Sequence, residues 1–266
     1  MNKIELDHEL PECIASWGWK FHHTGIPTEE KIPDERYIPH LKFYVSGFPT
    51  SPFGVEWMRF DDDCPVHPLI QRIPHIAFVV KDLDYELANR NFNLLGEPNT
   101  PSGGLQVAMI EHNGAPIELM EFENNILKLC LQDEQQPDKI MNKIRLDHEF
   151  AQCVEEWGWK YHHLGIPTKE QKENERYFPQ FKSHISEFDS NPFGIEWMRF
   201  EQDCKIQELI QKIPHIAFEA KDLDRELKNR GFNVISPPSV PSDGVRAVMI
   251  EYNGAPVQLI EFEKNR

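Results

Sequence analysis

The chain consists of one sequence unit that occurs twice. Met1–Ile4 returns as Met141–Ile144, and at this offset roughly 70 of the 126 aligned positions are identical without a gap. The segment between the copies ends in polar residues around Pro137, as linkers commonly do. We therefore expect a first domain over residues 1–126, a linker over 127–140 and a second domain over 141–266.

Each copy is rich in strand patterns and poor in helix patterns. Apolar residues at helical spacing predict one helix over Leu10–Trp17 and another over Leu83–Arg90, which follows Asp82 as a helix cap. Alternating and β-branched runs predict strands over Lys20–Pro27, Leu41–Phe48, Phe53–Phe60, Pro74–Val80, Leu105–Ile110 and Ile117–Phe122, the last two joined at Asn113-Gly114. The fold class is therefore expected to be α+β, with two β-rich half-units in each copy.

Charge narrows the choice of partners. The 44 acidic residues outnumber the 28 basic ones and give a formal charge of −16. Such a surface repels phosphate backbones and anionic lipid, so we expect neither nucleic acid nor a membrane as a partner. The residues from Met1 to Asp7 lack the apolar core of a signal peptide, and a cytoplasmic protein is expected.

Each half-unit opens with a strand that bears a histidine and closes with one that bears a glutamate. If the strands curl together, these side chains point into one hollow, and imidazole with carboxylate suits a divalent ion such as Zn, Ni, Fe or Mn. The candidate metal ligands of the first copy are His23, Glu56, His75 and Glu118. Their counterparts in the second copy are His163, Glu196, His215 and Gln258.

The second copy is therefore not equivalent to the first. Gln258 stands where the first copy has Glu118, and a neutral amide is a weaker ligand and a poorer proton acceptor than a carboxylate. The modules can pair within a copy or exchange between copies. Either arrangement leaves one hollow with four ligands and one that is compromised.

Two further considerations affect which side chains enter the hollow: the position of His22 beside His23, and the need of a buried Glu56 for a partner. His22 and His23 are adjacent on one strand, so we expect only His23 to enter the hollow and His22 to pack outside or bond at the surface. A buried Glu56 needs a partner, which is either a cation or an arginine such as Arg59.

The segments Pro74–Asp84 and Asn113–Phe122 resemble the second module of the vicinal oxygen chelate superfamily. This superfamily includes glyoxalase I, bleomycin resistance proteins, extradiol dioxygenases and methylmalonyl-CoA epimerase. The resemblance implies two βαβββ modules per copy that form a cupped mixed sheet, with the metal ligands on the first and last strands. The first module departs from this pattern, because Thr28–His40 carries two prolines where the family has a full helix.

The resemblance also implies a function. Two histidines and two glutamates match the bacterial glyoxalase I pattern, which implies a metal-dependent lyase or isomerase, similar to lactoylglutathione lyase, that acts on a small vicinal-oxygen substrate. Glu56 or Glu118 would then be the catalytic base. The alternatives are a metal-free protein that sequesters a small molecule, as the bleomycin resistance members do, and an extradiol-type dioxygenase. Fused copies also suggest a monomer with pseudo-dimeric halves or a homodimer.

Overall fold

The computed structural model describes residues 10–102, 104–122, 150–186, 191–242 and 244–263. The chain divides into two compact units. The first-copy unit is Trp19–Gln152, and the second-copy unit is Cys153–Arg266 together with Met1–Gly18. The predicted domain boundaries at residues 126 and 140 lie outside the described residues.

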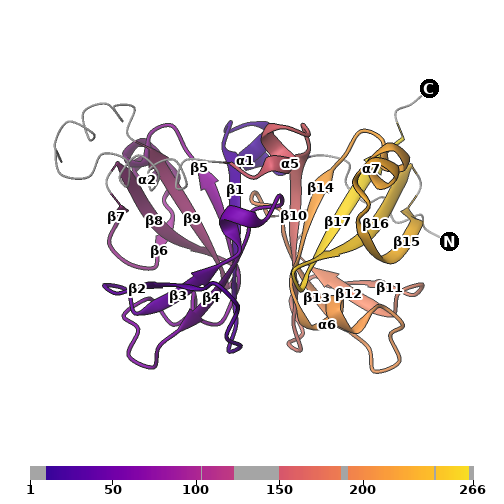
Figure 1. Cartoon of the computed structure of the whole chain (residues 1–266), viewed down its shortest axis with the longest axis horizontal. Helices are drawn as coiled ribbons and strands as arrows, with labels where there is room; N and C mark the ends of the chain where they lie inside the picture. Colours follow the sequence, from indigo (N-terminus) through magenta and orange to yellow (C-terminus); the bar gives the residue numbers. More distant parts are fainter. Residues whose placement is uncertain (1–9, 103, 123–149, 187–190, 243, 264–266) are drawn as a thin grey trace. The chain divides into compact units, whose positions relative to one another are not determined.

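The described residues of the first-copy unit form one mixed sheet of nine strands (Figure 1). The strand order is β2-β3-β4-β1-β5-β9-β8-β6, and β7 also pairs with β8. The elements are β1 (Lys20–Pro27), β2 (Arg36–Ile38), β3 (Phe43–Ser46), a 3-10 turn η1 (Phe48–Thr50), β4 (Val55–Phe60), β5 (His75–Val79), α2 (Leu83–Arg90), β6 (Asn93–Leu94), β7 (Asn99–Ser102), β8 (Leu105–His112) and β9 (Ala115–Phe122).

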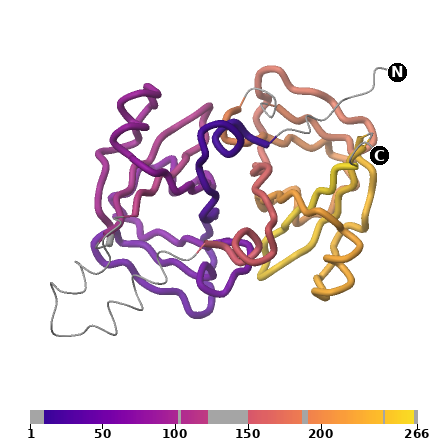
Figure 2. The backbone as a smooth tube through the Cα atoms, turned by 90° about the horizontal axis from the view of Figure 1, so that it is seen from above, coloured from indigo at the N-terminus to yellow at the C-terminus, as the bar shows by residue number. Residues whose placement is uncertain are grey.

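The second-copy unit repeats this topology with eight described strands in the order β11-β12-β13-β10-β14-β17-β16-β15. Its elements are α1 (Glu12–Ala15), α5 (Gln152–Glu155, which begins at the last residue of the first-copy unit), β10 (Lys160–Pro167), β11 (Arg176–Phe178), β12 (Ser183–Ser186), β13 (Ile195–Phe200), α6 (Glu208–Lys212), β14 (His215–Glu219), α7 (Leu223–Arg230), β15 (Asn233–Ser242), β16 (Val245–Tyr252) and β17 (Ala255–Phe262). Both sheets are curled (Figure 2), and the expected α+β class is confirmed.

Local sequence signals account for several element boundaries. The strand predicted over Lys20–Pro27 and the helix predicted over Leu83–Arg90 have the observed bounds of β1 and α2. Asp82 caps α2, because its Oδ1 accepts a hydrogen bond of 2.8 Å from the Tyr85 amide. Asn113 and Gly114 both have positive φ, 49° and 82°, which is the geometry of the tight hairpin turn between β8 and β9.

The structure differs from the sequence prediction near both ends of the first module. The helix predicted over Leu10–Trp17 is one turn long, α1, because the chain turns at Gly18 with φ 73°. Between β1 and β4 the chain forms two short strands, β2 and β3, and none of the described residues between β1 and β2 is helical. The prolines in this segment remove the amide donors that a helix there would need.

The N-terminal helix belongs to the second-copy unit. The amide of Cys13 donates a hydrogen bond of 2.9 Å to the carbonyl of Pro192, and the ring of Trp17 meets the edge of Phe193 at a centroid distance of 5.8 Å. Cys13 itself is fully buried. The start of the chain therefore completes the unit that the second copy forms.

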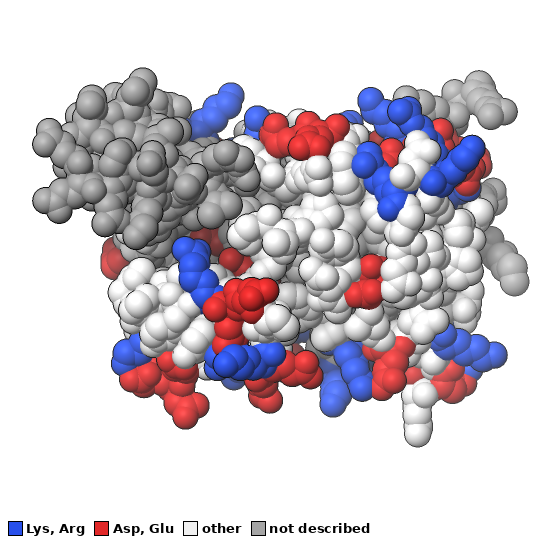
Figure 3. Space-filling view, in the orientation of Figure 1, with Lys and Arg blue, Asp and Glu red and all other residues white. Residues whose placement is uncertain are grey.

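The described surface carries charges of both signs. Lys and Arg side chains lie next to Asp and Glu on the face drawn in Figure 3. Among the residues that the structure describes, no helix is long and apolar enough to cross a membrane.

Candidate metal centres

The candidate ligands of the first copy lie on the four central strands of one sheet, β4-β1-β5-β9. Strand register places His23 opposite Ala77 on β5, and Ala77 opposite Glu118 on β9. Directly paired residues point to the same face, so His23 and Glu118 lie on either side of a side chain with a single methyl group. This small residue lets the two larger side chains meet above it.

Gly25, two residues after His23 on β1, likewise leaves space for larger side chains on the neighbouring strands. It pairs with Glu56 on β4 and with His75 on β5. A Cβ atom on Gly25 would lie 2.1 Å from Cε1 of His75, so the imidazole rests directly on the glycine backbone. The absence of a side chain at position 25 therefore fixes where His75 lies.

Three of the four first-copy ligand atoms converge, and we name this group the first cluster: His23, His75 and Glu118. The Nε2 atoms of the two histidines are 3.2 Å apart, and Oε2 of Glu118 lies 3.3 Å from His23 Nε2 and 3.2 Å from His75 Nε2. Ligands at about 2.1 Å around a tetrahedral cation are separated by roughly 3.4 Å. The donor atoms are therefore spaced as one divalent ion requires.

The second cluster uses the same two histidine positions with a different carboxylate. It consists of His163, His215 and Glu196. The Nε2 atoms of the histidines are 3.1 Å apart, and Oε1 of Glu196 lies 3.3 Å from His163 Nε2. Gln258 occupies the position of Glu118, and the third donor comes from β13 instead of the last strand of the copy.

Glu56 stands beside the first cluster without joining it. Burial raises the pKa of Glu56, although the neighbouring His23 and His75 oppose that shift. Burial also raises the pKa of Glu118, but hydrogen bonds with His23 and His75 outweigh it and hold that pKa well below its usual range. Arg59 does not pair with Glu56, because its guanidinium binds Glu35, with Nε 3.1 Å from the carboxylate.

The histidines of the two clusters also differ in their acidity. Burial lowers the pKa of His23, but the hydrogen bond with Glu118 outweighs burial and the net shift is upward. Burial lowers the pKa of His163 well below its usual value and that of His215 to about 4, while Gln258 opposes both shifts. Neutral imidazole is the form that binds a cation, so the second pair is ready to coordinate at neutral pH.

The expectation is that His22 packs outside the hollow or bonds at the surface, and the burial of His22 contradicts a surface position. His22 is only 2% exposed, and its Nδ1 lies 2.8 Å from Nδ1 of His23. The register of β1 against β5 shifts between Phe21 and His23, and such a bulge breaks the alternation of side chains on which the expectation rested. His162 and His163 repeat this contact at 2.8 Å.

The contact places His22 behind His23, a candidate metal ligand. Metal-binding histidines usually bond through their second ring nitrogen to a partner that orients them. His22 stacks on Phe48 at a centroid distance of 5.0 Å, which fixes its own ring. The pair of adjacent histidines in each copy is the only sequence feature that points to this contact. The bulge in β1 explains how both rings are buried.

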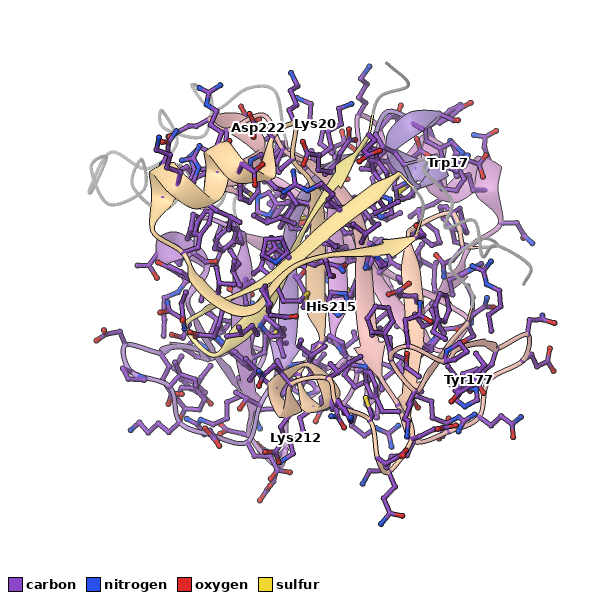
Figure 4. The ribbon with its side chains drawn as sticks, turned by 90° about the vertical axis from the view of Figure 1, so that its right-hand side faces the viewer. Trp17, Lys20, Tyr177, Lys212, His215 and Asp222 are labelled. Carbon is purple, nitrogen blue, oxygen red and sulfur yellow. The ribbon has the colours of Figure 1, made fainter. Side chains whose placement is uncertain are left out.

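A cavity of about 170 Å³ lies beside the second cluster, and His163, His215 and Glu196 are part of its wall. Figure 4 shows His215 at the centre of this unit, behind the strands β15, β16 and β17. Most of the remaining wall is apolar, with side chains such as Phe178, Met198 and Phe262. The prediction from sequence did not identify this wall, because its residues come from elements spread over the whole copy.

The four residues of each copy lie in one sheet, so each hollow pairs the two modules of a single copy. Two histidines and one carboxylate in each unit fit a divalent cation in number and type, and in the first cluster they also have the spacing of ligands around one ion. The arrangement can hold such an ion and leave positions open for oxygen atoms of a substrate.

Comparison with known proteins gives a structural likeness only. No protein-family model and no curated protein matches the chain. Similar solved structures include a glyoxalase I mutant from Zea mays (13% identity, TM-score 0.30), with coverage of 91% of this chain and 94% of that chain. A mutant of 4-hydroxymandelate synthase from Streptomyces coelicolor is 10% identical with a TM-score of 0.43, over 96% of this chain and 88% of its own.

A third similar structure is methylmalonyl-CoA epimerase from Mycobacterium tuberculosis, at 14% identity and a TM-score of 0.18, over 70% of this chain and 85% of that chain. All three proteins are members of the vicinal oxygen chelate superfamily, the family that the sequence resembles.

Proposed function

We propose that this protein is a metal-dependent lyase or isomerase of the glyoxalase type that acts on a small substrate with oxygen atoms on neighbouring carbons. The observation that supports the proposal is the convergence of two histidines and a carboxylate in each unit, with donor atoms 3.2 to 3.3 Å apart in the first cluster and all within 4.8 Å of one another in the second. A bound divalent ion would supply electrophilic stabilisation to the negative charge that develops on the substrate oxygens.

The residues of the first-copy unit divide into ligands and a base. His23, His75 and Glu118 would hold the ion, because their donor atoms meet at one point. Glu56 would take the proton from the carbon next to the chelated oxygen. Its raised pKa, caused by burial, brings a carboxylate closer to the range in which a general base works at neutral pH.

The second-copy unit would bind an ion and a ligand without this proton transfer. Glu196 is used as a ligand, and Gln258 cannot accept a proton as a carboxylate does. Two histidines and one carboxylate are also the donor set of non-haem Fe(II) oxygenases, which keeps the extradiol alternative open for this unit.

The test separates the ligand role from the base role. In Glu56→Gln we expect unchanged cation content and loss of substrate proton exchange, by about 10²- to 10⁴-fold. Exchange is measured by NMR in D₂O with hemithioacetals of methylglyoxal and either 2-mercaptoethanol or glutathione. In His75→Ala the first-copy unit should lose its cation. Full exchange in Glu56→Gln would refute the assignment of the base.

A second candidate is a metal-free protein that sequesters an apolar molecule, and the apolar wall of the second-copy cavity favours it. Elemental analysis after loading with Zn, Ni, Fe or Mn distinguishes the two. A chain that takes up no cation but still binds a small apolar molecule would be a sequestering protein.

A further inference from the structure

The cavity of the second-copy unit indicates the size of molecule that it can enclose. Its volume is about 170 Å³. An engineered protein cavity of about 150 Å³ with an apolar wall is known to bind benzene. The space beside the second cluster therefore fits a ring-sized molecule with a few substituents.

The wall of this cavity also sets a limit on ligand charge. None of the described residues that line it is Lys or Arg. The nearby Lys212 ends α6 with its side chain 67% exposed, and Figure 4 shows it at the outer margin of the unit. The carboxylate of Glu196 lies inside. In the metal-free unit a ligand with carboxylates, such as a glutathione conjugate, would meet no Lys or Arg here and would be repelled by the carboxylate of Glu196.

Polar atoms in the wall that have no hydrogen-bond partner among the described residues include Nδ1 of His215, Oε1 of Gln258 and Oγ of Ser183. Of these three residues, only Ser183 is not among the candidate metal ligands. Ser183, the first residue of β12, is 1% exposed and lines the cavity, and its Oγ has no hydrogen-bond partner among the described residues. Leaving a buried hydroxyl unpaired is unfavourable, so such a group in a ligand cavity marks a position where a ligand atom can bond.

The first copy shows that the fold does not need a serine at this position. Phe43 is its counterpart, and it packs with Val45 and Met58 in an apolar cluster. The remainder of the strand keeps its pairing in both copies, with Phe43 opposite Phe60 and Ser183 opposite Phe200. The serine therefore removes a large side chain from the wall and puts a hydrogen-bonding group in its place.

The register also shows which end of a ligand would reach the serine. Ser183 lies opposite Phe200, four residues along β13 from Glu196. Glu196 belongs to the second cluster, so Ser183 stands at the end of the wall remote from the metal ligands. A ligand that fills the cavity presents one end to the cluster and its opposite end to Ser183.

We infer that the second-copy cavity binds an uncharged, largely apolar, ring-sized molecule whose hydroxyl or carbonyl group bonds to the Oγ of Ser183. The inference rests on the proposed function only in that this molecule would be the substrate or ligand of the second cluster. It assigns Ser183 as the specificity-determining residue and separates the ligands of the two copies, because Phe43 offers no such bond.

The test uses two probes of nearly the same shape, 4-methylphenol and 1,4-dimethylbenzene, which differ by one hydroxyl group. Their binding to the full chain is measured by calorimetry after removal of metal with a chelator, so the result does not depend on metal chemistry. Ser183→Ala should weaken 4-methylphenol by about three- to tenfold and leave 1,4-dimethylbenzene unweakened.

Two further variants keep the test decisive. Ser186→Ala removes another buried hydroxyl of β12 that does not line the cavity, and it should leave both probes unaffected. Ser183→Phe restores the side chain of the first copy and should abolish binding of both probes in this unit.

Several results would overturn the inference. These are equal weakening of both probes in Ser183→Ala, the same selectivity loss in Ser186→Ala, no binding of either probe to the wild type, or competition by the anionic S-methylglutathione. Cation content is measured separately by elemental analysis. A failure of metal binding would refute the proposed function and leave the assignment of Ser183 to be judged by the probes alone.

Discussion

The two clusters place equivalent histidines against carboxylates from different strands. In the first cluster the third donor is Glu118 on β9, and in the second it is Glu196 on β13, the counterpart of Glu56. Among the four candidate ligand positions only one differs between the copies, Glu118 in the first and Gln258 in the second. In this fold a carboxylate on either of two strands can therefore lie against the same pair of histidines. Only the first copy has a second carboxylate, Glu56, that lies outside the cluster and could act as a base.

The largest expected effect comes from making the first copy like the second. In Glu118→Gln, we expect Glu56 to become the third ligand as Glu196 is in the second cluster, so that a cation is retained. Because the base is then occupied, proton exchange on the substrate should fall by about 10²-fold or more. Elemental analysis and NMR exchange measure the two effects in a His215→Ala background, where the second cluster is disabled. If Glu118→Gln kept full proton exchange, the assignment of Glu56 as either base or replacement ligand would be wrong.

His215 and His23 should respond to pH in opposite directions when metal is absent. Burial lowers the pKa of His215 to about 4, so the unfolded chain binds more protons than the folded chain between about pH 6.5 and pH 4. The second-copy unit should therefore lose about 3 kcal/mol of stability over that range from this residue alone. The raised pKa of His23 has the opposite sign, since its stabilising contribution is present at low pH and is lost as pH rises.

Amide hydrogen exchange distinguishes the two units in one sample. Protection of β14 should decrease on acidification by more than protection of β5. Equal loss in the two strands would contradict the assigned difference between the clusters.

The glycine beneath each metal-binding histidine gives a third test. Gly25→Ala places a methyl group where the ring of His75 lies, so the ring must move away from Glu118 and cation affinity of the first cluster should fall by about 100-fold. Gly96→Ala is the matched control, because a Cβ there meets nothing within 4 Å. Isothermal titration with Zn in the His215→Ala background measures the change. Unchanged affinity would show that His75 does not depend on this contact.

The smallest expected effect concerns the histidine behind the ligand. His22→Phe keeps an aromatic ring in the site but removes the 2.8 Å contact with His23, and cation affinity should fall by about tenfold. His67→Phe, at an exposed position, is the control. Equal affinities in the two variants would mean that His22 only fills space.

Some of the features on which these tests depend can be predicted from the sequence, and others cannot. The duplication is read directly from the repeated sequence. The strand β1, the helix α2 and the Asn113-Gly114 turn follow from local patterns, because each is determined by residues close together in the chain. The choice of Glu118 over Glu56 as the third donor depends on distances across a curled sheet, which no periodicity encodes. Local patterns therefore predict the helices, the strands and the candidate ligands, but they do not predict which three donor atoms lie close together.

The expectation for His22 depends on regular alternation of side chains along β1. A bulge between Phe21 and His23 interrupts that alternation. The face on which a strand residue lies therefore depends on the register with the neighbouring strand, which local sequence does not reveal.

We propose that each unit binds one divalent cation through the two histidines and the carboxylate of its cluster. The most direct measurement is the cation content of the intact chain after loading and gel filtration, for wild type, His75→Ala, His215→Ala and the double variant. The account predicts two ions per chain in the wild type, one in each single variant and none in the double variant. A wild-type chain without a bound ion, or a double variant that keeps two, would contradict it.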